Sequence, residues 1–157
     1  MYCIEEMTDS IAREISGWKY ADEYEIYSFE EGVETIAELM NGEYYSCTDQ
    51  EKNLIGYFCY GKSAQIPTVQ SEIYNGGALD IGLGLKPELC GRGLGEKFLK
   101  AGMNFAGEKW NPPAFRLSVA CFTWRAIKVY TRLGFQCRER ITHRITHMEF
   151  QKMVFKL

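Results

Sequence analysis

The stretch from Leu85 to Gly95, Leu-Lys-Pro-Glu-Leu-Cys-Gly-Arg-Gly-Leu-Gly, constrains the fold of this chain more than any other part of the sequence. It follows a segment, 78–85, whose leucines and isoleucine alternate with Asp and Gly, as on a strand with one apolar face. Beyond it, apolar residues recur at helical spacing as far as Phe105. A helix N-terminus offers unpaired N–H groups and the positive end of the helix dipole, and glycines let a phosphate reach them. The stretch therefore predicts a strand, a phosphate-binding turn and a helix.

The glycine spacing in this turn separates it from two common phosphate loops. It is not a Walker loop, because no Gly-Lys-Ser/Thr follows. It is not a dinucleotide fingerprint either, because its spacing is G-x-G-x-G and that fingerprint requires G-x-G-x-x-G. Two alternatives stay open. The stretch is a plain tight turn with no ligand, or it belongs to a different kind of module that binds nucleotide phosphates.

Length and composition predict an ordinary globular protein. The chain has 157 residues, of which 46% are apolar and 25% charged, and we expect a single domain over residues 1–157. No apolar run approaches the roughly 18 residues of a membrane span, and the first residues are acidic where a signal peptide is basic. The six cysteines include no C-x-x-C pair, which favours reduced thiols. We therefore expect a cytoplasmic protein with no membrane partner.

The net charge of −3 conceals a strong asymmetry along the chain. Residues 1–51 carry 14 Asp and Glu against two basic residues, whereas residues 52–157 carry 16 Lys and Arg against seven acidic ones. This division predicts an anionic ligand for the later part and a cationic one for the earlier part, or simply solvated helix faces. The acidic composition, without any RNA- or DNA-binding signature, predicts no nucleic-acid partner.

The remaining segments complete a mixed α/β pattern. Strands are expected at 2–7, 44–48, 54–60, 78–85 and 115–121, with two more in 135–157. Helices are expected at 8–17, 33–40, 94–105 and 126–133. Residues 18–29 have no clear period and five aromatic residues, which predicts a long covering loop, and 61–77 is a second loop.

With these elements in place, the chain resembles the GNAT superfamily of acyl-CoA-dependent N-acyltransferases. In that family a strand ends in Val/Leu-x-Pro, and Arg/Gln-x-x-Gly-x-Gly/Ala then opens a helix. Here the corresponding residues are Leu85-Lys86-Pro87, followed by Cys90-Gly91-Arg92-Gly93-Leu94-Gly95. Cys90 departs from the family pattern, in which Arg or Gln is usual.

A second segment carries the same resemblance. The family has a strand, then Asn-x-x-Ala, a tyrosine and Gly-Phe, and this chain has Thr123, Ala126, Tyr130 and Gly134-Phe135 after the strand at 115–121. Thr123 replaces the usual Asn, and its hydroxyl is expected to cap the following helix. The two segments occur in the family's order and distance, and the inferred elements match the family across nearly the whole chain.

The resemblance implies a fold and a set of cofactor-binding residues. The implied fold is an α/β (α+β) GNAT fold with a mixed, mostly antiparallel sheet of six to seven strands and about four helices. The implied cofactor is acetyl-CoA, in a cleft between the strand ending at Leu85 and that at 115–121. Its contacts are Leu83 and Leu85 for the pantetheine arm, Cys90, Gly91, Arg92, Gly93, Leu94 and Gly95 for the pyrophosphate, and Thr123 and Tyr130. Lys97, Lys100, Arg125, Lys128 and Arg132 are either phosphate contacts or ordinary surface charges.

Tyr130 lies where enzymes of this family often carry the acid that protonates the leaving thiolate. A phenol with a pKa near ~10 is protonated at neutral pH and can donate to a thiolate. The alternative is a packing aromatic on an amphipathic helix. Cys90, at a helix start, is either a thiol of lowered pKa or a bystander.

Asp80 is the candidate base for the acceptor amine, because Gly82 and Gly84 on its face of the strand leave room for a ligand. Alternatively, Asp80 binds a cationic acceptor or caps a turn. Other candidate bases are Glu23, Glu25 and Glu72, together with a water held by Asp80. His143 and His147 are expected to be exposed, with no metal site.

The sequence thus predicts an N-acetyltransferase that transfers acetyl directly from acetyl-CoA to a primary amine on a small molecule or a protein. The aromatic and acidic residues of 18–29 either suit a cationic acceptor or pack the helices onto the sheet. The alternative function is a non-catalytic acyl-CoA-binding sensor or scaffold. The sequence leaves open whether the protein forms a homodimer.

Overall fold

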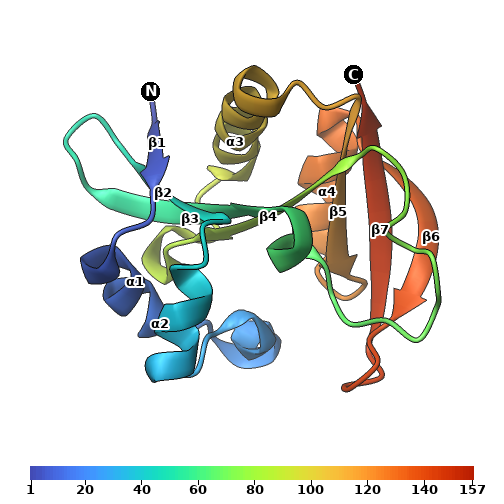
Figure 1. The fold of residues 1–157 in the computed structure, drawn as a ribbon, viewed down its shortest axis with the longest axis horizontal. Coiled ribbons are helices and arrows are strands. Elements are labelled where there is room, and N and C mark those ends of the chain that lie inside the picture. The colour runs from blue at the N-terminus through green and yellow to red at the C-terminus, as the bar shows by residue number, and fades with distance from the viewer. The chain divides into compact units, whose positions relative to one another are not determined.

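A computed structural model describes all 157 residues, Met1–Leu157, and contains seven strands and four α-helices (Figure 1). The strands are β1 (Cys3–Glu6), β2 (Tyr44–Thr48), β3 (Leu54–Tyr60), β4 (Leu79–Leu85), β5 (Ala114–Ala120), β6 (Gln136–Thr142) and β7 (Glu149–Lys156). The helices are α1 (Asp9–Ser16), α2 (Val33–Leu39), α3 (Gly95–Trp110) and α4 (Trp124–Leu133). Every strand and α-helix expected from the sequence is confirmed.

Three short 3₁₀ helices occur where the sequence predicted loops. They span Asp22–Tyr27, Gly61–Ala64 and Pro87–Leu89. A 3₁₀ turn repeats every three residues and is short, so it leaves no apolar face that a 3.6-residue period would detect. The prediction of an irregular loop over 18–29 is therefore wrong for its central part.

The strands follow the order β1-β2-β3-β4-β5-β7-β6. The pairs β1–β2, β2–β3, β5–β7 and β6–β7 are antiparallel, and β4–β5 is parallel. This agrees with the predicted mixed, mostly antiparallel sheet. The parallel ladder is short, joining Leu79 to Phe115 and Asp80 to Arg116.

The chain forms two compact units. It passes from one unit to the other within β3, within β4 and at the start of α3. The first comprises Met1–Cys59 and Leu83–Leu94, and the second Tyr60–Gly82 and Gly95–Leu157. In the first unit, α1 and α2 lie side by side next to β2 and β3 (Figure 1). Thr8 caps α1 by accepting from the Ile11 amide at 3.3 Å. Ile15 of α1 and Leu39 of α2 are fully buried, so these two helices contribute the apolar core of the unit.

In the second unit, α3 buries Phe98 and Leu99. Helix α4 ends at Gly134, whose φ of +112° is left-handed and which donates to the Thr131 carbonyl. At that angle a side chain would be strained, and its Cβ would lie 3.0 Å from the Phe155 ring. Glycine is therefore required at the end of this helix.

Strand β6 is the last strand of the sheet order, and a loop of the second unit lies on its end. The Val69 amide donates to the Thr142 carbonyl at 3.1 Å, and the Thr142 amide donates to Oε1 of Gln70 at 3.1 Å. Thr68, which precedes Val69, and His143, which follows Thr142, form an isolated β-bridge. No helix in the chain combines the length and the apolar character that crossing a bilayer demands.

Candidate active site

The loop after β4 has the open main chain that the sequence predicted. Gly91 and Gly93 both have φ of +76°, and nothing lies within 4 Å of a Cβ built on either residue. Gly91, Arg92 and Gly93 are exposed, and the 16-residue helix α3 begins at Gly95. The first N–H groups of a helix have no partners within it. The loop therefore fits a phosphate group that approaches the backbone without meeting a side chain.

The end of β4, where this loop begins, is held by two hydrogen bonds within the first unit. The Lys86 amide donates to the Ile55 carbonyl at 2.8 Å, and the Tyr20 hydroxyl donates to the Leu85 carbonyl at 2.6 Å. Burial raises the pKa of Tyr20, so its hydroxyl keeps its proton and donates. The sequence did not predict this hydrogen bond of Tyr20, because its partner lies 65 residues away.

Cys90 is a weakly bonded thiol next to the same carbonyls. Its Sγ lies 3.7 Å from the Lys86 oxygen and 3.9 Å from the Leu85 oxygen. Desolvation raises the pKa of Cys90, which is opposite to the lowered pKa expected of a thiol at a helix start. The bystander interpretation of Cys90 therefore agrees with the structure.

Asp80, the candidate base, is enclosed in a network of hydrogen bonds. Its Oδ1 accepts from Nε of Arg116 at 2.5 Å, and its Oδ2 accepts from Nη2 of Arg116 and Nε2 of Gln65, each at 2.8 Å. Arg116 donates further to the carbonyls of Tyr74 and Asn75. Both members of the ion pair have side chains only 5% exposed. Asp80 is thus the buried counter-ion of Arg116, an arrangement that argues against a base role.

The room that Gly84 was expected to leave for a ligand is filled by Tyr57. A Cβ on Gly84 would overlap the ring and hydroxyl of Tyr57. Gly84 is therefore required for the close approach of an aromatic ring to β4. The expectation that it leaves room for a ligand needs this correction.

Aromatic residues of the 18–29 segment pack around Tyr57. The ring centroids of Trp18 and Phe29 lie 6.2 and 5.8 Å from that of Tyr57, and that of Tyr44 lies 6.1 Å away. Trp18 and Tyr57 are buried. For Trp18 and Phe29, the structure agrees with the packing interpretation of these aromatic residues.

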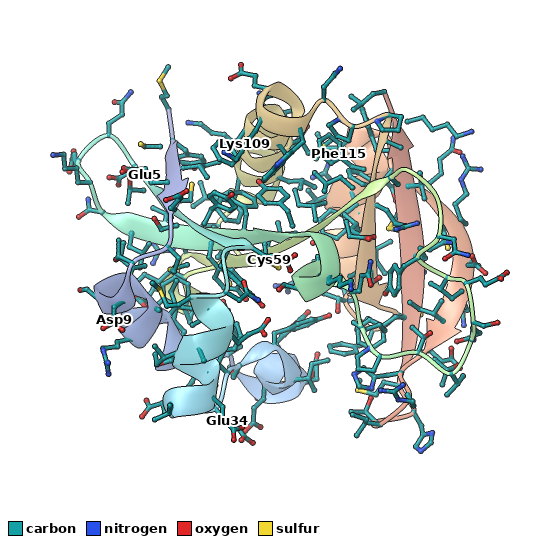
Figure 2. The ribbon with its side chains drawn as sticks, in the orientation of Figure 1. Glu5, Asp9, Glu34, Cys59, Lys109 and Phe115 are labelled. Carbon is teal, nitrogen blue, oxygen red and sulfur yellow. The ribbon has the colours of Figure 1, made fainter.

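The acidic side chains of the same segment face solvent. Asp22, Glu23 and Glu25 of the 3₁₀ helix are exposed, and so is Glu34 of α2, which projects outward (Figure 2). In the second unit, Glu72 is exposed and has a left-handed φ of +61°. The alternative bases Glu23, Glu25 and Glu72 are thus surface carboxylates.

Helix α4 carries the last two site residues predicted from the sequence. Thr123 is buried at the N-cap position, but its side chain makes no capping hydrogen bond, so that expectation is wrong. The helix begins instead with a main-chain bond, from the Ile127 amide to the Thr123 carbonyl at 3.1 Å. Tyr130 is half-buried, and its ring lies 6.2 Å from that of Phe135. It is neither enclosed as a core residue nor fully exposed.

Lys100, Arg125, Lys128 and Arg132, all candidate phosphate contacts, have neighbours within the second unit. Lys100 and Arg132 lie 3.7 and 4.0 Å from Glu96, as exposed pairs that contribute little stability. Arg125 and Lys128 lie over the exposed ring of Trp124, at 5.5 and 5.1 Å. In the described chain, no group of three or more His, Cys, Asp or Glu residues is arranged to hold a metal ion.

The comparison of this chain with known proteins rests on structure. No protein-family profile matches it, and no curated protein matches its sequence. A mutant form of the spermidine/spermine N-acetyltransferase SpeG from Vibrio cholerae is 15% identical, with a TM-score of 0.73 over 99% of this chain and 95% of that one. The same enzyme in complex with manganese ions is 15% identical, with a TM-score of 0.70 and coverages of 99% and 92%.

A third structure gives the same result. The dodecameric structure of spermidine N-acetyltransferase from Vibrio cholerae in an intermediate state is 16% identical, with a TM-score of 0.71 over 99% of this chain and 93% of that chain. The match covers nearly the full length of both chains. The chain therefore has the GNAT fold of these N-acetyltransferases, as its two sequence segments predicted.

Proposed function

We propose that the chain is an N-acetyltransferase that moves the acetyl group of acetyl-CoA directly to a primary amine. The observation that carries the proposal is the loop at Gly91 and Gly93, where two left-handed glycines with open surroundings precede α3. Such a loop suits the pyrophosphate of CoA, and it occurs here in a fold whose solved relatives are N-acetyltransferases.

In this proposal the residues of the loop and β4 bind the cofactor. The main-chain amides from Cys90 to Gly95 bind the pyrophosphate, and the pantetheine arm follows β4 at Leu83 and Leu85. Tyr20 supports this arrangement indirectly, because it fixes the Leu85 carbonyl at the point where strand becomes loop.

The chemical step requires one proton donor and one proton acceptor. The acceptor ammonium first loses one proton to water, and its neutral nitrogen then forms a bond to the thioester carbonyl carbon. As the C–S bond breaks, Tyr130 supplies a proton to the departing sulfur and later regains one from water. The amine proton passes to water, because the carboxylate of Asp80 is committed to Arg116 and Gln65. No covalent enzyme intermediate is formed.

We assign the acceptor to small molecules with a positively charged amine. Support comes from the exposed carboxylates of Asp22, Glu23 and Glu25 and from the negative balance of residues 1–51, which attract cations. The solved enzymes of this fold act on spermidine and spermine by their names, so polyamines come first among acceptors to test.

The test is thiol release from acetyl-CoA over a panel of amines, with the product identified by mass. The panel contains spermidine, spermine, a monoamine, free lysine and a peptide with a free N-terminus. Turnover with polyamines supports both the reaction and the acceptor class, whereas turnover with the peptide alone assigns a protein acceptor. Binding of acetyl-CoA without turnover of any amine would favour a sensor or scaffold, and the absence of binding would overturn the proposal.

A further inference from the structure

Tyr57 differs from its neighbouring tyrosines because the residue is buried but its hydroxyl has no hydrogen-bond partner within the protein. The residue is 9% exposed, and its environment contains no hydrogen bond to the phenol. The hydroxyls of Tyr20 and Tyr44, in the same cluster, donate to the Leu85 carbonyl at 2.6 Å and to Oε2 of Glu38 at 2.9 Å. Buried hydroxyls are nearly always bonded, so this exception calls for an explanation.

The Tyr57 hydroxyl is enclosed but not sealed. Every side-chain nitrogen or oxygen that is completely shielded from solvent in this structure has a partner. The Tyr57 oxygen has none within the protein, so it is not completely shielded and keeps at least a small surface that is accessible to solvent. An unpaired hydroxyl of this kind can form a hydrogen bond with a bound ligand.

The position of this hydroxyl is set by Gly84. The ring and hydroxyl of Tyr57 occupy the place that a Cβ of residue 84 would take. The phenol therefore lies directly on the main chain of β4, one residue before Leu85 and the turn into the glycine loop. Trp18, Phe29 and Tyr44 surround the ring and hold it there.

The chemistry of the hydroxyl selects the partner. Desolvation raises the pKa of Tyr57 well above its ordinary value, so the phenol is neutral and carries a proton to donate at physiological pH. A reacting amine must keep its lone pair free for the carbonyl carbon, which makes it a poor partner for a donor. A carbonyl oxygen is a matching acceptor.

We propose that the hydroxyl of Tyr57 donates a hydrogen bond to a carbonyl oxygen of the acyl-pantetheine arm of acetyl-CoA where the arm follows β4. The inference rests on the proposed function, because that function brings the arm to this strand. The carbonyl belongs either to the thioester or to one of the two pantetheine amides, and the experiment distinguishes the two sources.

The decisive variant is Tyr57→Phe, compared with Tyr20→Phe and Tyr44→Phe. Replacing Tyr57 removes an oxygen that bonds to nothing in the protein, so the melting temperature should stay the same or rise slightly. Both control variants remove existing hydrogen bonds and should lower it. Titrations with acetyl-CoA and with CoA, and steady-state rates with an amine that the wild type accepts, complete the comparison.

Two outcomes support the inference and separate the carbonyls. If the partner is the thioester, Tyr57→Phe lowers kcat/KM for acetyl-CoA about 10-fold or more, while the affinity for CoA changes less than about twofold. If the partner is a pantetheine amide, the affinities for acetyl-CoA and CoA fall together by about 3–10-fold.

Other outcomes overturn it. Unchanged binding and turnover in Tyr57→Phe, with an active wild type, would refute the role of Tyr57 and leave the proposed function intact. A change confined to the KM of the amine would assign the hydroxyl to the acceptor instead. A wild-type protein that binds no acetyl-CoA would overturn the proposed function and this inference with it.

Discussion

Arg116 binds both carboxylate oxygens of Asp80, through Nε at 2.5 Å and Nη2 at 2.8 Å. The two residues are register partners in the parallel ladder between β4 and β5, and both side chains are 5% exposed. A buried charge without its partner is strongly unfavourable, so each residue depends on the other for a stable fold.

Asp80→Asn should destabilise the protein without removing a catalytic group. The neutral amide leaves the guanidinium of Arg116 buried without a counter-charge, which should lower the free energy of unfolding by about 3–5 kcal/mol. Urea unfolding measures the loss. As a matched control, Glu96→Gln removes a carboxylate from exposed pairs and should cost less than about 1 kcal/mol. Intact stability together with a lost acidic limb of the pH–rate profile would instead identify Asp80 as the base.

Tyr130→Phe tests the proton donor. The phenylalanine ring preserves the packing against Phe135 but cannot protonate sulfur, so kcat should fall by about 10²–10⁴-fold while the affinity for acetyl-CoA changes little. Steady-state kinetics and a binding titration give the two quantities. A fold-change of only two or three would mean that water supplies the proton and that Tyr130 merely positions the thioester.

Gly93→Ala tests the phosphate contact, with Gly42→Ala as its control. Both glycines have positive φ, +76° and +93°, and open surroundings, so each substitution should cost a similar amount of backbone strain, about 1–2 kcal/mol. Only Gly93 lies in the loop that is proposed to bind CoA. The rise in melting temperature on adding acetyl-CoA should therefore shrink in Gly93→Ala and persist in Gly42→Ala. Equal rises in melting temperature in both variants would show that the loop is a turn that does not bind the phosphate.

The stability of the chain should decline in alkaline solution. Desolvation raises the pKa of the fully buried Cys47 from 9.0 to about 12. Below pH 9 the thiol is protonated in both states, and between pH 9 and 12 only the unfolded state loses the proton. The free energy of unfolding should thus fall by about 1.4 kcal/mol per pH unit in this range from Cys47 alone.

Chemical denaturation between pH 8 and 11, under reducing conditions, measures this slope. Cys47→Ala should make the slope shallower, although the smaller side chain lowers stability at neutral pH. Cys137→Ala removes an exposed thiol and should retain the slope of the wild type. A Cys47→Ala variant with the wild-type slope would contradict the assignment.

The strand, turn and helix from β4 to α3 were predictable because their signals are local. Glycine spacing and apolar period are read within a few residues, and they predicted the open main chain at Gly91 and Gly93. The partner of Asp80 was not predicted, because the register of β4 on β5 is set by packing between distant segments. One signal was present nonetheless: Arg116 stands in the apolar strand at 115–121, and a charge there requires an opposite one.

The roles of Tyr20 and Tyr57 could not be predicted from the sequence. Both are aromatic residues in aromatic-rich segments, and nothing nearby distinguishes a bonded hydroxyl from an unbonded one. That distinction depends on which part of β4 each ring meets. For Tyr57 the indication lies 27 positions away, in the missing side chain of Gly84.

The loop that bonds to Thr142 affects how the protein behaves in a crowded solution. An outer strand offers unpaired amides and carbonyls to which a strand of another chain can add, the first step of edge-to-edge aggregation. Here Val69 and Gln70 already occupy the amide and carbonyl of Thr142. Further along β6, the exposed charges of Arg138 and Arg140 oppose a flat, apolar contact. Residues of the same chain thereby prevent a strand of another molecule from adding to this edge of the sheet.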